Sequence, residues 1–234
     1  MIFEREVKIG KRLQQLQSLV TEPYDHIWDC CCDHGLLGAA LLRQHPESHI
    51  HFVDVVPALI DALNERLSQH FADRTHRWQT LCMDAGALPL NDYPGKHLVI
   101  IAGVGGDLMM DMVARLQDAN PEKELDFLLC PVHHQYALRT LLISRGFKLK
   151  EEVLVEENRR FYEIMLVTTH QNTHQPYADI SPVGSRLWLT VDQVQPDNRK
   201  RYLTQTLAHY ERIQRGKPDD VQPILHAYQQ VNLS

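Results

Sequence analysis

The sequence lacks long apolar runs and paired-cysteine motifs. No stretch approaches the roughly 18 apolar residues that cross a bilayer, and the first residues, Met1 to Glu6, contain no secretory hydrophobic region. The five cysteines include three neighbours and no Cys-x-x-Cys spacing. This pattern disfavours a disulfide framework and a zinc site. These absences predict a cytoplasmic protein with free thiols, no membrane contact and no bound metal.

An overall basic excess, which a general nucleic-acid binder usually carries, is also missing. The formal net charge is −6, and a hydrophobic content of 44% with 23% charged residues is ordinary for a globular protein. Basic residues nevertheless gather near both ends of the chain. Such clusters form either solvated helix faces or local basic patches. They comprise Arg5, Lys8, Lys11 and Arg12 near the start, and Arg199, Lys200, Arg201, Arg212, Arg215 and Lys217 near the end.

Apolar runs alternate with helical patterns from residue 26 to residue 168, which predicts a parallel sheet covered by helices on both faces. The polar stretch Glu156-Glu157-Asn158 separates the last two runs and predicts an antiparallel hairpin at the sheet edge. A mostly parallel, seven-stranded sheet with its last strand reversed is the Rossmann-like class I methyltransferase arrangement. The expected strands are 27–31, 49–54, 78–83, 97–102, 125–130, 148–155 and 160–167, and the expected helices are 36–44, 57–71, 107–116 and 136–145.

The C-terminal part of the sequence has a different pattern. The chain turns polar from Thr168 to Ser181, which predicts a linker. Two later stretches repeat apolar residues at helical spacing on either side of Gly216, and they predict an αα-hairpin. The expected organisation is an α/β domain over residues 1–168 and a small helical extension over residues 182–234. The repeating apolar residues are Leu203, Leu207, Tyr210 and Ile213, then Val221, Leu225 and Tyr228.

Two unusual turns follow predicted strands. Three glycines in the four positions from Gly103 to Gly106 allow a ligand to come close to the backbone. The turn from Asp29 to Gly35 follows the first strand, and both turns fall at the strand ends where ligands bind in such sheets. Together they predict a nucleotide-like cofactor. A nicotinamide dinucleotide fingerprint is disfavoured because Leu108 occupies its sixth position and the glycines follow the fourth strand.

Carboxylates follow the first three predicted strands, at Asp29, Asp54 and Asp84. Asp54 is either the residue that binds a ribose diol or an ordinary residue flanking the next helix. Asp84 is either an acceptor for an adenine amino group or a turn former. The sequence alone leaves both alternatives open.

These motifs resemble those of the bacterial TrmK family, whose members are S-adenosylmethionine-dependent tRNA (adenine-22-N1)-methyltransferases. The likeness runs from Lys8 to Val167, and this sequence departs from the family pattern at three places. Cys31 replaces a glycine, Val104 replaces a methionine, and Cys130-Pro131-Val132-His133 replaces Gln-Pro-Asn. The resemblance rests on Asp29 to Gly35, Asp54, Asp84-Ala85-Gly86, Ile101 to Gly106 and Phe161-Tyr162-Glu163-Ile164.

The resemblance implies S-adenosylmethionine as cofactor and tRNA as partner, held by the two C-terminal helices and the basic N-terminal residues. By position, Asp33 and His34 flank the methionine end of the cofactor and are the candidate catalytic residues. A carboxylate at Asp33 would stabilise the positive charge that develops on a methylated adenine N1, and His34 would orient that carboxylate or the base. The implied cofactor-binding set is Asp29, Cys31, Asp33, Gly35, Asp54 and Val55 for the methionine end and ribose, Asp84 and Ala85 for adenine, and Ala102, Gly103, Gly105 and Gly106 for the floor of the transfer site.

Two further interpretations remain. In the first, the methyl acceptor is a small molecule or another protein, which the acidic net charge favours. In the second, this protein binds cofactor or RNA without catalysis, which the departures at Cys31 and Cys130 to His133 favour. The sequence does not decide whether His133 and His134 face the substrate, and it does not indicate an oligomeric state.

Overall fold

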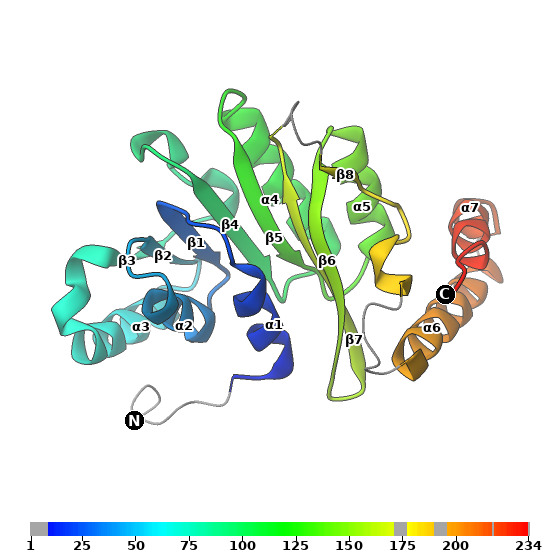
Figure 1. The fold of residues 1–234 in the computed structure, drawn as a ribbon, viewed down its shortest axis with the longest axis horizontal. Helices are drawn as coiled ribbons and strands as arrows, with labels where there is room; N and C mark the ends of the chain where they lie inside the picture. Colours follow the sequence, from blue (N-terminus) through cyan, green and yellow to red (C-terminus); the bar gives the residue numbers. More distant parts are fainter. Residues whose placement is uncertain (1–8, 171–176, 190–195, 217, 234) are drawn as a thin grey trace.

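The computed structural model describes residues 9–170, 177–189, 196–216 and 218–233, and these form a mixed eight-stranded sheet with helices on both faces (Figure 1). The strand order is β3-β2-β1-β4-β5-β7-β6-β8. Strands β1 to β5 are parallel, and β7 pairs antiparallel with β5 and β6. The strands are β1 (His26–Cys30), β2 (His49–Asp54), β3 (Trp78–Cys82), β4 (His97–Ala102), β5 (Leu125–Cys130), β6 (Lys148–Glu157), β7 (Arg160–Thr168) and β8 (Ala178–Asp179).

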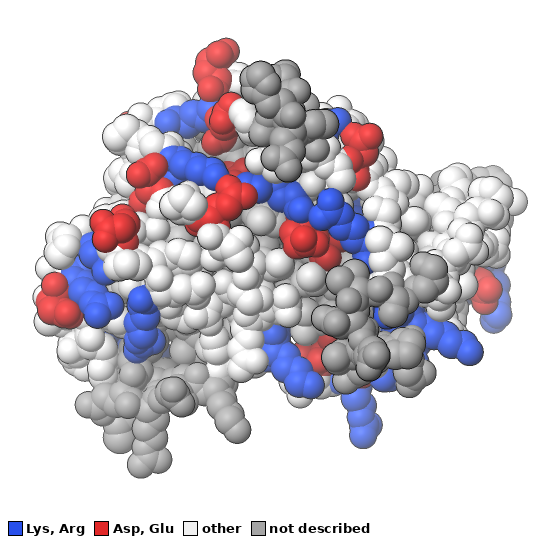
Figure 2. All heavy atoms as spheres, viewed as in Figure 1, with Lys and Arg blue, Asp and Glu red and all other residues white. Residues whose placement is uncertain are grey.

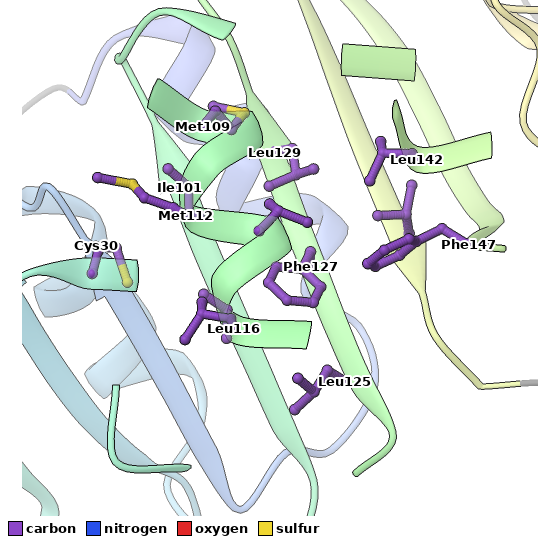
Figure 3. Close-up of a cluster of buried hydrophobic side chains, with 14 of the residues drawn as sticks. Cys30, Ile101, Met109, Met112, Leu116, Leu125, Phe127, Leu129, Leu142 and Phe147 are labelled. Atoms are coloured by element: carbon purple, nitrogen blue, oxygen red, sulfur yellow. The ribbon is translucent and has the colours of Figure 1, made fainter. Parts of the chain in front are cut away.

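Two apolar clusters hold helices against the two faces of the sheet. Helices α1 (Lys11–Leu19), α2 (Leu36–Gln44) and α3 (Pro57–His70) pack on one face through residues such as Leu16, Leu41 and Leu63. Helices α4 (Gly106–Ala119) and α5 (Gln135–Ser144) pack on the other through residues such as Met109 and Leu142, which belong to the apolar cluster drawn in Figure 3. The remaining short helices are η1 (Ala72–Arg77), η2 (Ala85–Ala87), η3 (Leu90–Asp92) and η4 (Arg186–Trp188).

The predicted class I arrangement is confirmed, including the reversal of the last long strand. In the β6–β7 hairpin, Glu157 pairs with Arg160. The loop therefore has two residues, Asn158 and Arg159, and both have positive φ angles, 52° and 62°. Two consecutive positive φ angles are the geometry of the type I′ turn that suits the twist of a hairpin. The turn comes slightly later than the polar stretch from Glu156 to Asn158 had indicated.

Apart from the four short η helices, two elements were not predicted. Helix α1 was missed because its sequence is mostly polar, although Leu16 on its inner face is fully buried. Strand β8 has two residues and lies in the segment predicted as a linker, of which residues 171–176 fall outside the described residues. Because β8 pairs with β6, the long hairpin is not the edge of the sheet, and the seven-stranded prediction becomes eight.

The predicted helical hairpin is present as α6 (Pro196–Gln214) and α7 (Pro218–Gln229), which lie together at one end of the molecule (Figure 1). Their aromatic residues pack against one another and against the segment before them. Tyr202 stacks on Trp188 with ring centroids 5.7 Å apart, and Tyr210 stacks on Tyr228 at 5.9 Å. The boundary between residues 168 and 182 remains a prediction.

A buried ion cluster joins this extension to the sheet. Arg139 of α5 contacts Glu152 of β6 and Glu163 of β7 at 2.7 Å each, and none of the three side chains is exposed to solvent. The Tyr202 hydroxyl of α6 donates a hydrogen bond to Glu163 at 2.5 Å. Burial raises the pKa of Tyr202, so its hydroxyl keeps the proton that it donates. The α6 helix is thus held by a buried polar contact as well as by apolar packing.

A second polar network lies at the amino ends of the parallel strands. The His51 ring stacks on Trp28 with centroids 3.7 Å apart, and its Nδ1 lies 2.7 Å from the Gln79 amide nitrogen. The Trp28 indole donates to His97 Nδ1 at 3.1 Å. Burial lowers the pKa of His51 to about 2 and that of His97 to about 4, so both imidazoles are neutral at pH 7.

No helix in the described part of the chain is long and apolar enough to cross a membrane.

Candidate active site

The sequence-predicted residues converge at the carboxyl ends of the parallel strands. The loop after β1 follows a sharp path, with positive φ angles at Cys31 (56°), Asp33 (49°) and Gly35 (67°). Cys31 lies among the carboxylates of Asp29, Asp54 and Asp84, since all three raise the pKa of its thiol. The first three strands therefore bring their carboxylates to one place, as their spacing had predicted.

Asp54 retains hydrogen-bonding capacity towards the cleft. Its Oδ2 accepts from the Asp33 backbone amide at 3.2 Å, and its Oδ1 accepts from the Val56 amide at 3.1 Å. A carboxylate has about four acceptor positions, so two are left for an external donor such as a diol. Val55 beside it is 61% exposed and presents an apolar surface next to those oxygens. Asp54 thus both shapes the loop and offers acceptors to a ligand.

Asp29 lies deeper than the other carboxylates and connects two elements. Its Oδ2 accepts from the Gly38 amide of α2 at 2.8 Å. Burial raises the pKa of Asp29 to about 7. A side chain at Gly38 would place its Cβ 2.8 Å from that carboxylate and 2.3 Å from the Phe52 ring. Asp29 therefore holds the start of α2 against β1, directly beneath the loop.

Asp84 is engaged by a residue that the sequence analysis missed. Arg115 of α4 forms two hydrogen bonds to it, at 2.7 Å and 3.0 Å, and the Gly86 amide donates a third at 2.8 Å. A Cβ at Gly86 would lie 2.1 Å from the Arg115 guanidinium, so a side chain there would require Arg115 to move. Ala85 is buried in the core, so its side chain does not face the cleft. Asp84 stays a prediction as an adenine ligand, and its turn-forming contact with Gly86 is observed.

The glycine turn after β4 serves two purposes. Gly103 has a φ of 85°, and the first group that a Cβ there would approach is the Arg12 guanidinium, at 3.3 Å. Gly105 and Gly106 instead let the turn lie against the loop after β5. A Cβ on Gly105 would lie 2.5 Å from the His133 ring, and one on Gly106 would lie 2.7 Å from the His133 carbonyl oxygen. Of these three glycines, Gly103 therefore faces the Arg12 side chain, whereas Gly105 and Gly106 face the loop after β5.

A cavity of about 120 Å³ lies between α1, the loop after β1, the start of α2 and the end of β4 at Ala102. The candidate catalytic pair is on its rim, with Asp33 Oδ1 3.7 Å from His34 Nδ1, and both side chains are exposed. That separation is longer than a hydrogen bond, so the predicted orientation of Asp33 by His34 stays a prediction. The lining includes Arg12, Asp29, Cys31, Asp33, His34 and Ala102.

A larger groove of about 600 Å³ runs beside the cavity, between the β6–β7 hairpin, the start of α5 and helices α6 and α7. It contains both His133 and His134, and His134 Nδ1 lies 2.9 Å from the Asp107 carboxylate. The rest of its lining includes Arg159, Arg160, Phe161, Tyr162, Tyr202, His209, Tyr210 and Tyr228. Lys and Arg side chains gather at the lower edge of the molecule, around the hairpin tip and α6 (Figure 2).

The cysteines near the site lack the properties of nucleophiles or metal ligands. Burial raises the thiol pKa of both Cys31 and Cys130 to about 11, which keeps them protonated at pH 7. Among the residues that the structure describes, no cluster of three or more His, Cys, Asp or Glu could hold a metal ion. The chemistry of the cleft therefore depends on its carboxylates, imidazoles and guanidinium.

Comparisons with known proteins agree with this geometry. M. capricolum TrmK in complex with S-adenosyl-homocysteine matches with a TM-score of 0.72 and 14% identity over 95% of this chain and 96% of that chain. The B. subtilis m1A22 tRNA methyltransferase TrmK matches with a TM-score of 0.62 and 19% identity, covering 96% and 94%. Magnesium protoporphyrin IX methyltransferase (ChlM) from Synechocystis PCC 6803, with bound SAM, has a TM-score of 0.53 and 15% identity, covering 68% and 80%. A search of curated proteins finds no match.

The family model for the methyltransferase domain matches residues 9–165. This range contains all the residues that line the small cavity, from Arg12 on α1 to Ala102 on β4. The chain therefore belongs to the methyltransferase domain family.

Proposed function

We propose that this protein transfers a methyl group from S-adenosylmethionine to N1 of an adenine in tRNA, at position 22. The observation that carries the proposal is the extent of the structural likeness. The TrmK structures cover about 95% of this chain, whereas the porphyrin methyltransferase covers 68%. Residues after 181 make up more than a fifth of the 234 residues, so the TrmK matches must include most of α6 and α7. The likeness therefore includes the wall of the large groove.

The residues at the strand ends fit the proposed cofactor. Asp54 has two acceptor positions left for the ribose diol, and the exposed Val55 side chain would lie against the adenine ring. The turn at Gly103 would form the floor of the transfer site, with the Arg12 guanidinium beside it. The small cavity, lined by charged groups of both signs, suits the zwitterionic methionine end.

S-adenosylmethionine supplies a methyl group that is already electrophilic when it is bound. The protein must therefore mainly hold the acceptor nitrogen in line with it at contact distance. The exposed Asp33 carboxylate lines the small cavity, where it would stabilise the cationic base that methylation creates. No proton has to leave adenine N1 before the transfer, so Asp33 acts by charge and position.

The groove supports RNA as the acceptor. Five aromatic side chains line it, and a base that has left its stack binds well on such surfaces. The exposed Arg159 and Arg160 at the hairpin tip place positive charge beside it, for contact with phosphates. A local basic edge of this kind is compatible with the acidic net charge of the whole protein.

The test is a methylation assay with methyl-labelled S-adenosylmethionine and an unmodified tRNA transcript that has adenine at position 22. We expect label in 1-methyladenosine at that position, mapped by nuclease digestion and mass spectrometry. A transcript with guanine at position 22 is the matched control and should remain unlabelled. Label at another nucleotide would refute the assigned position. Cofactor binding by calorimetry without label in any tRNA would refute the RNA acceptor.

A further inference from the structure

Arg12 is the basic residue that reaches from α1 into the small cavity. Its backbone amide donates to Glu157 Oε1 of β6 at 3.3 Å, and a Cβ at the preceding Gly10 would lie 2.2 Å from the same oxygen. The close approach at Gly10 fixes the start of α1 against the β6–β7 hairpin. Because of this anchor, the Arg12 side chain points across the carboxyl ends of the strands.

The guanidinium is held over the cleft by a ring and a thiol. Its central carbon lies 5.2 Å from the centroid of the Tyr162 ring, a cation–π distance. It also lies near Cys130, where its positive charge partly offsets the rise in thiol pKa that burial causes. Its Nη1 lies 3.3 Å from the position of a Cβ on Gly103. Three elements therefore direct it towards the point where β4 and β5 end.

The Arg12 guanidinium has no ion pair with a carboxylate within 4.0 Å among the residues that the structure describes, because Glu157 accepts from the backbone amide of Arg12 and not from its side chain. Arg115 at the same edge of the sheet is instead paired with Asp84. A half-buried guanidinium without an anion is costly unless a ligand supplies one. The small cavity that Arg12 lines therefore fits a ligand that carries a carboxylate.

We propose that Arg12 binds the α-carboxylate of the methionine end of S-adenosylmethionine, with Tyr162 as the surface that orients its guanidinium. The inference rests on the proposed function only for the identity of the cofactor. The fork of an arginine matches a carboxylate with two parallel hydrogen bonds, which a lysine does not reproduce. Arg12 is thus a cofactor-binding residue supplied by a helix outside the predicted cofactor loops.

Calorimetry with two ligands tests the assignment without requiring turnover. S-adenosylmethionine and its decarboxylated analogue differ by the carboxylate alone. For Arg12→Met we expect the affinity for S-adenosylmethionine to fall about 10- to 100-fold, as for loss of a charge-assisted pair. The affinity for the decarboxylated analogue should change by less than about threefold. Lys11→Met is the matched control, since it removes a neighbouring exposed charge and should alter neither affinity.

Two more variants keep the test decisive if Arg12→Met does not fold. Arg12→Lys retains the charge, so its loss of affinity for S-adenosylmethionine should be roughly half that of Arg12→Met on a logarithmic scale. Tyr162→Leu should lower the affinity for S-adenosylmethionine several-fold and leave the affinity for the decarboxylated analogue unchanged. Equal losses for both ligands, or no loss for either, would overturn the assignment. A fall in tRNA affinity with unchanged cofactor affinity would show that Arg12 binds a phosphate instead. Wild-type protein that binds neither ligand would refute the proposed cofactor.

Discussion

The two ends of the parallel strands both gather polar side chains, but they use them differently. At the amino ends, His51, His97, Trp28 and Gln79 satisfy one another in buried pairs. At the carboxyl ends, backbone amides occupy only two acceptor positions of Asp54, and the Asp33 side chain is exposed. Buried polar groups in a stable core have hydrogen-bond partners within the protein, whereas a ligand needs donors and acceptors that are still unoccupied. The number of unoccupied donors and acceptors therefore distinguishes the structural network from the candidate site.

The largest expected effect concerns the amino-end network. Burial lowers the pKa of His51 from 6.5 to about 2 in the folded protein. As the pH falls below 6.5, the unfolded chain therefore binds a proton at His51 that the folded protein does not bind, and the free energy of unfolding decreases. At one pKa unit per 1.36 kcal/mol, His51 alone should account for roughly 3 kcal/mol between pH 6.5 and pH 4. Urea unfolding at a series of pH values should show that His51→Gln weakens this dependence.

His76→Gln provides the control for that measurement, because His76 is exposed in η1. Its pH profile should follow that of the wild type. If the stability of His51→Gln depended on pH in the same way as that of the wild type, the stacked imidazole would not titrate on unfolding. The contrast between the two ends of the sheet would then lose its thermodynamic basis.

At the carboxyl end, Asp33→Asn should lower turnover in the tRNA assay by at least about 100-fold, the loss typical of one group that stabilises transition-state charge. Cofactor affinity should stay within about threefold, because the Asp33 backbone amide still donates to Asp54. Single-turnover methylation together with calorimetry measures both quantities. Asp61→Asn, an exposed carboxylate change on α3, is the control. Normal turnover in Asp33→Asn would remove this residue from the mechanism.

The smallest effect separates strain from chemistry in the loop after β1. Cys31 holds a φ of 56°, which costs a residue with a Cβ roughly 1–2 kcal/mol relative to glycine. Both Cys31→Ala and Cys31→Gly remove the thiol, but only glycine relieves the strain. Thermal unfolding should therefore show the glycine variant to be about 1 kcal/mol more stable than the alanine variant. If alanine is as stable as glycine, the loop is not strained at this position.

Much of the fold could be read from the sequence because its signals are local. The strands from His49, His97 and Leu125 have the predicted bounds, since each is a buried apolar run with polar flanks. The convergence of Asp29, Asp54 and Asp84 followed from parallel strand ends meeting at one edge. The short β8 gave no such signal, because two residues paired to β6 carry no pattern of their own.

The missed parts of the site depend on contacts between distant segments. Arg12 belongs to a basic run that reads as a solvated helix face, and only the packing of α1 on the β6–β7 hairpin turns it towards the cleft. Arg115 is 31 residues from its partner Asp84, so no spacing rule connects them. The roles of Gly105 and Gly106 emerged only from the position of His133. Sequence patterns located the loops, and tertiary packing determined which side chains enter the cleft.

The buried Arg139 cluster limits how this chain can be divided into fragments. A polypeptide ending at residue 168 would keep Arg139, Glu152 and Glu163 but lose the Tyr202 hydroxyl, the Ser181 carbonyl and the Arg186 amide, which bond to them. In such a fragment each buried carboxylate would lack a hydrogen-bond donor that it has in the whole chain, and it would have to be hydrated by opening the hairpin that carries Tyr162. Vectors for expressing the catalytic part alone should therefore extend through α6, even though the family match ends at residue 165.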